Sequence, residues 1–245
     1  SKNLGIYDNP KELLSISLGS AETTLLKLTS AYSVFMNGGK LVEPILIDRI
    51  QDSEGKTIFN NSKRKCVNCD QISYLGKEYP VIENDYKKVF SPQTAYQMTS
   101  ILEGVVQRGT AKKLKDLQLN IAGKTGTTNK NTDTWFIGYT SNLLIGVYVG
   151  LDNPSPLGRF ETGSKTALPI FKEFAKKTVN KSDSRPFKAA KGTVMMVVDP
   201  NTGQKAKFDS KNTIMEVYKN QHVIDGKVLY SNNDRLDTNN ILKFY

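Results

Sequence analysis

The residues best suited to chemistry are six consecutive small or polar ones at positions 123–128, Gly-Lys-Thr-Gly-Thr-Thr. Lys124 supplies a cation, Thr125 a hydroxyl and Gly126 a position without a side chain. In a β-strand Lys124 and Gly126 face one side and Thr125 the other, although at a sheet edge Thr125 can still lean into a cleft. Charge, a directed hydrogen bond and room beside the backbone suit a carboxylate, so we expect an anionic, peptide-like substrate.

The same letters could belong to a phosphate-binding loop, because Gly-Lys-Thr also ends that motif. The motif needs a glycine five positions before Gly123, where this chain has Gln118. It also needs a following helix whose amide groups and dipole face the phosphates. The next residues instead place a large side chain at every second position up to Tyr139, as a strand does. We therefore exclude nucleotide binding here.

Residues 122–128 and 133–139, Ala-Gly-Lys-Thr-Gly-Thr-Thr and Asp-Thr-Trp-Phe-Ile-Gly-Tyr, resemble the third active-site motif of penicillin-binding transpeptidases. More narrowly, they resemble bifunctional class A enzymes of the penicillin-binding protein 1A type. The resemblance covers most of residues 5–178 and includes segments 18–20, 31–32, 37–39, 104–106, 108–111 and 167–171. It implies an α+β fold of the penicillin-binding transpeptidase and serine β-lactamase kind, with an antiparallel sheet covered by helices.

The resemblance also implies a reaction, peptidoglycan D,D-transpeptidation. A lysine-activated serine attacks the carbonyl between the two terminal D-alanines of a stem peptide, and an amine of a neighbouring stem then takes the acyl group. Lys124 would hold positive charge near the substrate carboxylate and support proton movement, and Thr125 would hydrogen-bond that carboxylate. The amide of Thr127 would supply half the oxyanion hole. Gly126 and Thr128 would contact the substrate.

The implied partners are the stem peptide and β-lactam antibiotics, which mimic the D-alanyl dipeptide. No metal and no organic cofactor are expected. The chain's one histidine, His222, has no marked serine or aspartate partner that would indicate a Ser-His-Asp triad. Two alternatives stay open. One is a serine β-lactamase-like hydrolase, which shares the motif, and the other is a non-catalytic carboxylate-binding or scaffold module.

The nucleophilic serine of the family is not identified in these residues. Ser-x-x-Lys occurs twice, at 53–56 and 62–65, but both stretches follow the place where the family has its second motif. The first carries a Glu-Gly turn signal and the second is strongly basic, so we interpret both as surface loops. We expect the nucleophile upstream of residue 1, in which case this chain is an N-terminally truncated transpeptidase, inactive by itself.

The first three residues spell Ser-x-Asn, the family's second motif. Ser1 and Asn3 could be that motif, with Ser1 relaying protons and Asn3 binding the substrate amide, if a stretch is missing before Leu4. They could also be a chance match at the start of the chain. The chance interpretation is favoured because the same three letters recur at 210–212 in an unrelated setting.

The chain is basic, with 34 Lys and Arg against 24 Asp and Glu and a formal charge of +10. The lysines are scattered and do not form an arginine-rich helix or a basic stripe with aromatics, so we predict no nucleic-acid partner. No apolar run is long enough to span a bilayer. The resemblance places the protein on the periplasmic side of the inner membrane, anchored by a segment outside this chain. The oligomeric state stays open.

The two cysteines, Cys66 and Cys69, are separated by two residues. A structural zinc site normally needs four ligands, and the lone histidine is far away in sequence. In an oxidising compartment a local disulfide is the better interpretation. We predict that it staples a protruding hairpin inserted at about residues 60–88.

Hydrophobic spacing and turn residues predict the elements that position the motif. We expect a helix capped by Ser20 and ending at 37–39, a strand from Ile45 to Ile50, and a helix from Ser91 to Gly109. Three strands at 119–127, 134–140 and 143–150 joined by short turns give the antiparallel sheet, which a helix at 166–178 covers. The predicted division is a transpeptidase part at 1–178, a linker at 179–186 and a C-terminal extension at 187–245.

Overall fold

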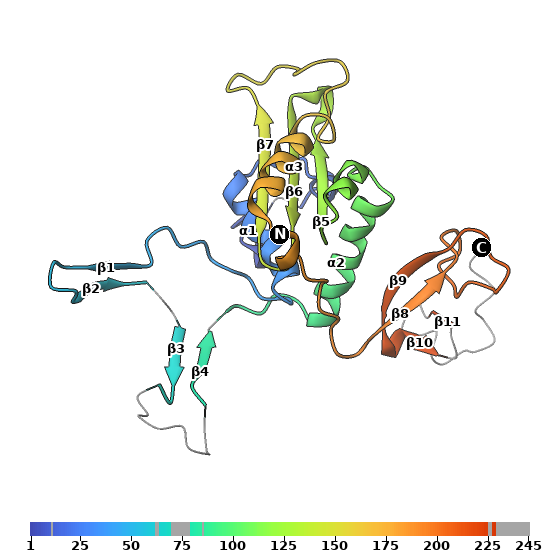
Figure 1. The fold of residues 1–245 in the computed structure, drawn as a ribbon. Coiled ribbons are helices and arrows are strands. Elements are labelled where there is room, and N and C mark those ends of the chain that lie inside the picture. The colour runs from blue at the N-terminus through green and yellow to red at the C-terminus, as the bar shows by residue number, and fades with distance from the viewer. Residues whose placement is uncertain (11, 62–63, 70–78, 85, 225–226, 229–245) are drawn as a thin grey trace.

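A three-stranded antiparallel sheet, in the order β5, β6, β7, forms the centre of the chain (Figure 1). The computed structural model describes residues 1–10, 12–61, 64–69, 79–84, 86–224 and 227–228. A tight turn joins β6 and β7, where the amide of Thr140 donates to the carbonyl of Leu143 at 2.9 Å. The predicted strands are therefore confirmed as β5 (Ala122–Thr127), β6 (Asp133–Tyr139) and β7 (Leu144–Gly150).

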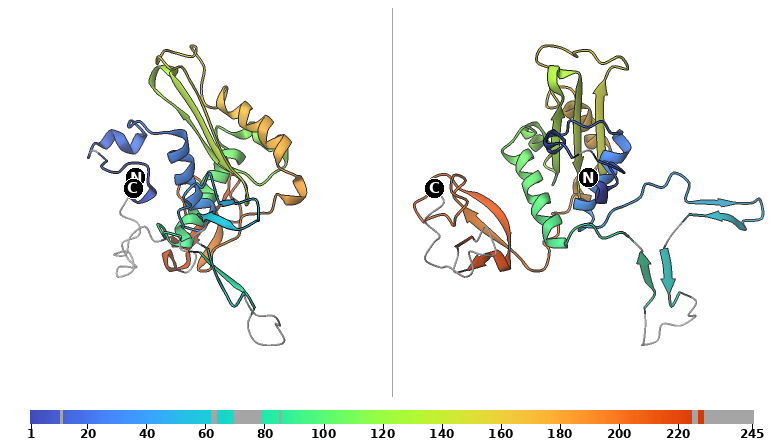
Figure 2. Two further views of the ribbon diagram at one scale, coloured as in Figure 1. Left: turned by 90° about the vertical axis from the view of Figure 1, so that its left-hand side faces the viewer. Right: turned by 180° about the vertical axis from the view of Figure 1, so that it is seen from behind.

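Helices cover both faces of the sheet (Figure 2). On one face lies α3 (Ala167–Thr178), whose Phe171 ring packs against Phe136 of β6 with centroids 4.7 Å apart. On the other face, Tyr139 packs among partly buried and buried side chains of α1 (Leu25–Met36) and α2 (Pro92–Gln107). Because Phe136 and Tyr139 point to opposite faces of β6, the central strand is buried on both.

The start of α2 follows the prediction and the start of α1 does not. Ser91 caps α2 by accepting from the Thr94 amide at 3.2 Å, with Pro92 as the first helical residue. The prediction that Ser20 caps the first helix is wrong, because Thr24 holds that position and accepts from the Lys27 amide at 3.2 Å. A cap hydroxyl has to reach an amide two or three residues ahead, and Ser20 lies too early.

Two hairpins leave the body between residues 40 and 88 (Figure 1). Lys40 and Lys88 form an isolated antiparallel bridge. The first hairpin pairs β1 (Arg49–Gln51) with β2 (Thr57–Asn60). The prediction of a strand from Ile45 was wrong for its first part, because β1 begins at Arg49, which pairs with Asn60, the last residue of β2. The alternation of apolar residues therefore begins at Ile45, before the first residue of β1 that pairs with β2.

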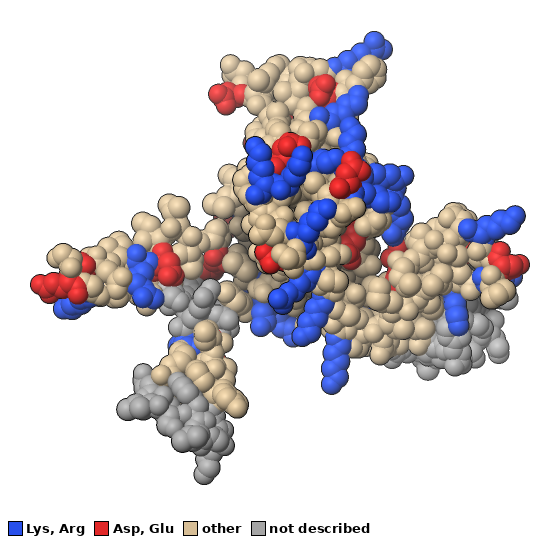
Figure 3. Space-filling model, in the orientation of Figure 1, with Lys and Arg blue, Asp and Glu red and all other residues tan. Residues whose placement is uncertain are grey.

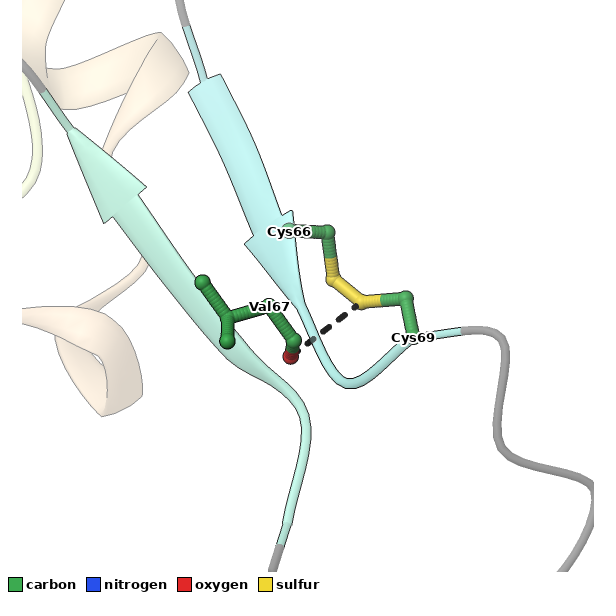
Figure 4. The surroundings of a disulfide bond; sticks show 3 residues. All are labelled: Cys66, Val67 and Cys69. Carbon is green, nitrogen blue, oxygen red and sulfur yellow. Dashed lines mark hydrogen bonds between the residues drawn. A yellow bond between two sulfur atoms is a disulfide. The ribbon is translucent and has the colours of Figure 1, made fainter.

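The second hairpin pairs β3 (Arg64–Val67) with β4 (Val81–Asn84) and carries the predicted disulfide. Cys66 lies in β3, and its sulfur atom is bonded to that of Cys69, which follows the strand, with Cα atoms 5.7 Å apart (Figure 4). Asn68 between them takes a left-handed conformation with φ of 64°. The disulfide therefore closes a tight turn at the end of a strand.

The C-terminal part of the described chain contains two antiparallel two-stranded sheets. One pairs β8 (Thr193–Val198) with β9 (Ile214–Lys219) and lies beside α2, and the other pairs β10 (Val223–Ile224) with β11 (Lys227–Val228). The core that they share contains Met196, Val198 and Val228. Short 3₁₀ helices complete the described elements: η1 (Lys2–Leu4), η2 (Leu14–Leu18), η3 (Lys112–Leu117), η4 (Asn129–Asn131), η5 (Lys181–Asp183) and η6 (Asn220–His222). No helix of the described ranges is long and apolar enough to cross a membrane.

Candidate functional site

The predicted motif lies on β5, which among the described strands pairs with β6 alone and so forms an edge of the central sheet. Lys124 is opposite Ile137 and Gly126 is opposite Trp135, while Thr125 is opposite Phe136. Lys124 and Gly126 therefore share the face that α1 and α2 cover elsewhere, and Thr125 lies on the α3 face. This division of the motif between two faces agrees with the prediction from strand geometry.

The hydrogen-bond register of β5 directs two peptide units to the free edge. The amide of Thr128 donates to the carbonyl of Asp133 at 3.0 Å, so this pair is hydrogen-bonded. Bonded and non-bonded pairs alternate in an antiparallel ladder, so the backbone amide and carbonyl groups of Thr125 and Thr127 point to the free edge of the sheet. The Lys124 ammonium donates to the outward carbonyl of Thr125 at 2.9 Å. The amide of Thr127 therefore points away from the sheet.

Lys124 is an exposed cation beside this edge. Among the residues that the structure describes, it makes no ion pair, and its ammonium is held by the neutral carbonyl of Thr125. An ammonium without a carboxylate partner keeps donors available for an anionic ligand.

The hydroxyl of Thr125 forms a hydrogen bond with the hydroxyl of Thr110, with 2.9 Å between the oxygens. Thr110 follows the C-terminal end of α2, and its neighbour Ala111 is fully buried. This contact was not predicted from the sequence. The segment 108–111 was part of the family resemblance, but nothing in a single sequence indicates that the end of a helix meets a strand fifteen residues later.

The hydroxyl of Thr127 has a partner on the α3 face. It accepts a hydrogen bond from the amide of Gly163 at 3.0 Å, in the loop that leads into α3. A Cβ atom on Gly163 would lie 2.5 Å from the Gly126 carbonyl oxygen and 2.6 Å from that of Trp135, so only glycine fits against the two strands. This loop therefore holds the side chain of Thr127 away from the edge where its amide points.

Thr128 belongs to a network at the turn between β5 and β6. Its hydroxyl lies 2.7 Å from that of Thr132 and accepts from the Asp133 amide at 2.8 Å. The Asp133 carboxylate accepts a hydrogen bond from the Tyr148 hydroxyl at 2.7 Å, which raises the pKa of Tyr148. The structure thus places the Thr128 side chain in the turn and not beside Lys124, and its substrate contact stays a prediction.

The carboxyl group with the most strongly shifted pKa in the described chain lies on α2, beside the other end of the sheet. Burial raises the pKa of Glu103 to about 7. Its negative charge adds to the effect of burial in raising the pKa of Tyr139, whose hydroxyl lies 2.9 Å from that of Thr99. Tyr139 pairs with Ala122, five residues before Thr127 on β5. We interpret this cluster as part of the packing of α2 on the sheet.

The other candidates from the sequence lie outside this edge. Ser53 sits in the turn between β1 and β2, and Ser62 lies outside the described residues. The carbonyl of Ser1 accepts from the amides of Leu4 and Ile6, and Asn3 lies in η1, so the two interpretations of that triplet stay open.

No group of three or more potential metal ligands occurs in the described ranges. On the face in Figure 3, acidic side chains lie among the basic ones.

Comparison with known proteins gives one consistent family. Residues 2–176 match the family model described as the penicillin binding protein transpeptidase domain. Penicillin-binding protein 1A of Rickettsia bellii is 38% identical over 242 residues, covering 96% of this chain and 30% of its own length. That of Pseudomonas aeruginosa is 31% identical over 237 residues, covering 84% of this chain and 29% of its own length. The chain thus spans about 30% of the length of these relatives.

Solved structures give the same fold. The crystal structure of penicillin-binding protein 1A from Haemophilus influenzae matches with a TM-score of 0.73 and 29% identity, covering 89% of this chain and 35% of that one. PonA1 from Mycobacterium tuberculosis, solved in complex with penicillin V, matches with a TM-score of 0.51 and 20% identity over 76% of this chain and 51% of its own. At that identity the second match supports the fold alone.

Proposed function

The chain belongs to the penicillin-binding protein transpeptidase family, and from this premise we propose that it supplies the carboxylate-binding and oxyanion strand of a peptidoglycan D,D-transpeptidase. The observation that carries the proposal is the edge strand β5. It presents an exposed Lys124 ammonium and an outward Thr127 amide beside a position without a side chain, Gly126. These are the groups that an anionic peptide needs for binding along a strand.

In the proposed complex the terminal carboxylate of a D-alanyl-D-alanine stem lies at Lys124 and Thr125. The ammonium contributes charge and the hydroxyl a directed hydrogen bond. The acyl part of the peptide runs along Gly126 as an added strand, and β-lactams take the same place as mimics of the dipeptide. The Thr127 amide then faces the carbonyl oxygen that becomes negative during attack, where one such donor contributes about 3 kcal/mol of transition-state stabilisation.

The proposed reaction proceeds through a serine ester. A serine oxygen attacks the carbonyl carbon, the bond to the last D-alanine breaks, and that residue leaves with a proton; an amine of a second stem then displaces the serine. The described residues 53–56 form a hairpin turn away from β5, so we propose that the nucleophile comes from a part of the protein outside these 245 residues. Within the whole protein this part would act on the periplasmic side of the inner membrane.

A titration with a short peptide tests the site without the nucleophile. Trp135 is the single tryptophan of the chain and lies opposite Gly126, so its fluorescence should respond when a peptide occupies the strand. The ligand is N-acetyl-D-alanyl-D-alanine, and the matched control is the same peptide with an amidated C-terminus. Saturable quenching by the acid but not by the amide supports the proposal, and equal responses to both would overturn the carboxylate site.

Mass spectrometry tests the position of the nucleophile. After incubation of the folded chain with excess benzylpenicillin we expect no penicilloyl adduct. An adduct that survives denaturation and maps to any serine of this chain would contradict the proposal that the nucleophile lies elsewhere. Circular dichroism on the same sample shows that the chain is folded.

A further inference from the structure

We infer that Thr110 is a positioning residue that turns the only hydroxyl proton of Thr125 toward a bound carboxylate. This inference rests on the function proposed above. The two hydroxyl oxygens lie 2.9 Å apart, and either one could be the donor. Thr110 would not touch the ligand itself, and it would act through Thr125.

Counting donors decides the direction of this hydrogen bond when an anion is bound. A threonine hydroxyl has one proton and two lone pairs, whereas a carboxylate can only accept. The Thr125 proton must therefore go to the carboxylate, and the hydrogen bond between the threonines must be donated by Thr110. Such a chain of donors also polarises each member, which strengthens the last hydrogen bond.

The backbone around Thr110 is held firmly enough for this task. The Gly109 amide bonds to the carbonyls of Gly104 and Val105, and the Ala111 amide bonds to the same Val105 carbonyl at 3.1 Å. A Cβ atom on Gly109 would lie 2.8 Å from the Val105 Cα atom, so the chain folds tightly back on the end of α2. Thr110 is thus fixed on both sides although its own side chain is exposed.

The test is a double-mutant cycle in the full 245-residue chain, with the affinity for N-acetyl-D-alanyl-D-alanine measured by Trp135 fluorescence. Thr110→Val keeps the shape and removes the hydroxyl, and we expect roughly five- to tenfold weaker binding, the range of one hydrogen bond. Thr110→Ser should keep the affinity within about twofold of the wild-type value, since it keeps the hydroxyl donor. In a Thr125→Val background the Thr110→Val change should have no further effect.

Controls separate this inference from folding and from the proposed function. Thr178→Val removes a hydroxyl that bonds to the Phe174 carbonyl within α3, and it should leave the affinity unchanged. Additive effects of the two substitutions, or an unchanged affinity in Thr110→Val, would overturn the inference while the carboxylate site stands. If the wild-type chain does not respond to the peptide, the proposed function fails and the inference fails with it. Thermal unfolding of each variant shows that the comparison is made on folded protein.

Discussion

Thr125 and Thr127 are two residues apart on one strand, and the structure gives their hydroxyls different partners. Thr125 meets Thr110 and Thr127 meets the amide of Gly163. In the proposed site Thr125 acts through its side chain and Thr127 through its backbone. The Thr127 hydroxyl is bonded to the loop before α3, whereas the strand register turns its backbone amide to the free edge, as the proposed oxyanion role requires.

Removal of the Lys124 charge should weaken peptide binding without loss of stability. Lys124→Met keeps much of the aliphatic part of the side chain and removes the ammonium. We therefore expect binding of N-acetyl-D-alanyl-D-alanine to weaken by about 10- to 100-fold, the range for a hydrogen bond to a charged group. Lys113→Met changes another exposed lysine, in η3, and is the control. A loss of affinity as large in Lys113→Met would mean that general charge, and not this position, attracts the ligand.

A methyl group on Gly163 should destabilise the loop against the sheet. In Gly163→Ala the new atom would meet the carbonyl oxygens of Gly126 and Trp135 at 2.5 and 2.6 Å. Two backbone groups cannot move aside cheaply, so we expect a loss of about 2–4 kcal/mol in the free energy of unfolding. Urea denaturation measures it, with the exposed neighbour Lys165→Ala as a control. A loss below about 0.5 kcal/mol would show that the strands yield easily.

At the scale of elements, α2 connects the sheet to both the site and the C-terminal part. Its buried Leu102 packs with Ala122 of β5 and Tyr139 of β6. Its last turn leads into Thr110, beside β5. Glu103 is a partly buried residue of α2, and its burial raises the pKa of its carboxyl group. We therefore expect the packing of this helix to depend on pH.

Stability should fall as the pH rises from about 4.5 to about 7, because Glu103 has a folded pKa of about 7 against an ordinary value of 4.5. In that window the folded chain binds more protons than the unfolded chain, so deprotonation favours unfolding. The side chain keeps contact with water, and we expect on the order of 1–2 kcal/mol, less than full conversion of the shift. Glu103→Gln should flatten the urea-midpoint profile over this range. Glu173→Gln, at an exposed position of α3, should not flatten the profile, and an equal effect of both substitutions would contradict the assignment to Glu103.

At the scale of the whole molecule, the sheet of β8 and β9 in the C-terminal part is held against α2 by polar contacts. The Gln97 side-chain amide donates to the Val217 carbonyl at 3.1 Å, and Arg108 forms an ion pair with Glu216 of β9. Arg108 is two residues from Thr110, so this contact lies close to the candidate site. The division at the linker 179–186 stays a prediction, although Ser184 is tied to Asn120 by two hydrogen bonds of 2.9 Å.

The ion pair between Arg108 and Glu216 should couple the two parts only weakly. Their side chains are 42% and 20% exposed, so water and salt screen the pair. A double-mutant cycle with Arg108→Gln and Glu216→Gln should give a coupling of about 0.5–1 kcal/mol that decreases in 1 M salt. The control is the pair of Lys172 and Asp116, whose carboxylate is 77% exposed and whose coupling should be smaller. A salt-independent coupling would instead indicate packing.

The sequence by itself determined the family, the strands that carry the motif and the start of α2. These features depend on periodicity and turn chemistry within a few residues, which a single chain displays directly. The sequence placed the cap of α1 wrongly at Ser20, because Ser20 and Thr24 can both cap a helix. It also began the β1 strand too early at Ile45, because the apolar alternation starts before the paired residues. The structure selects Thr24 by its contact with an amide, and it ends the strand where its partner ends.

Only the tertiary structure decided which groups meet at the edge of the sheet. The contact of Thr110 with Thr125 and that of Gly163 with Thr127 join residues 15 and 36 positions apart. Such contacts depend on how α2 and the loop before α3 pack on β5, and no local pattern encodes that packing. The motif therefore indicated the chemistry from the sequence, and the fold determined which hydroxyls and amides face the candidate ligand.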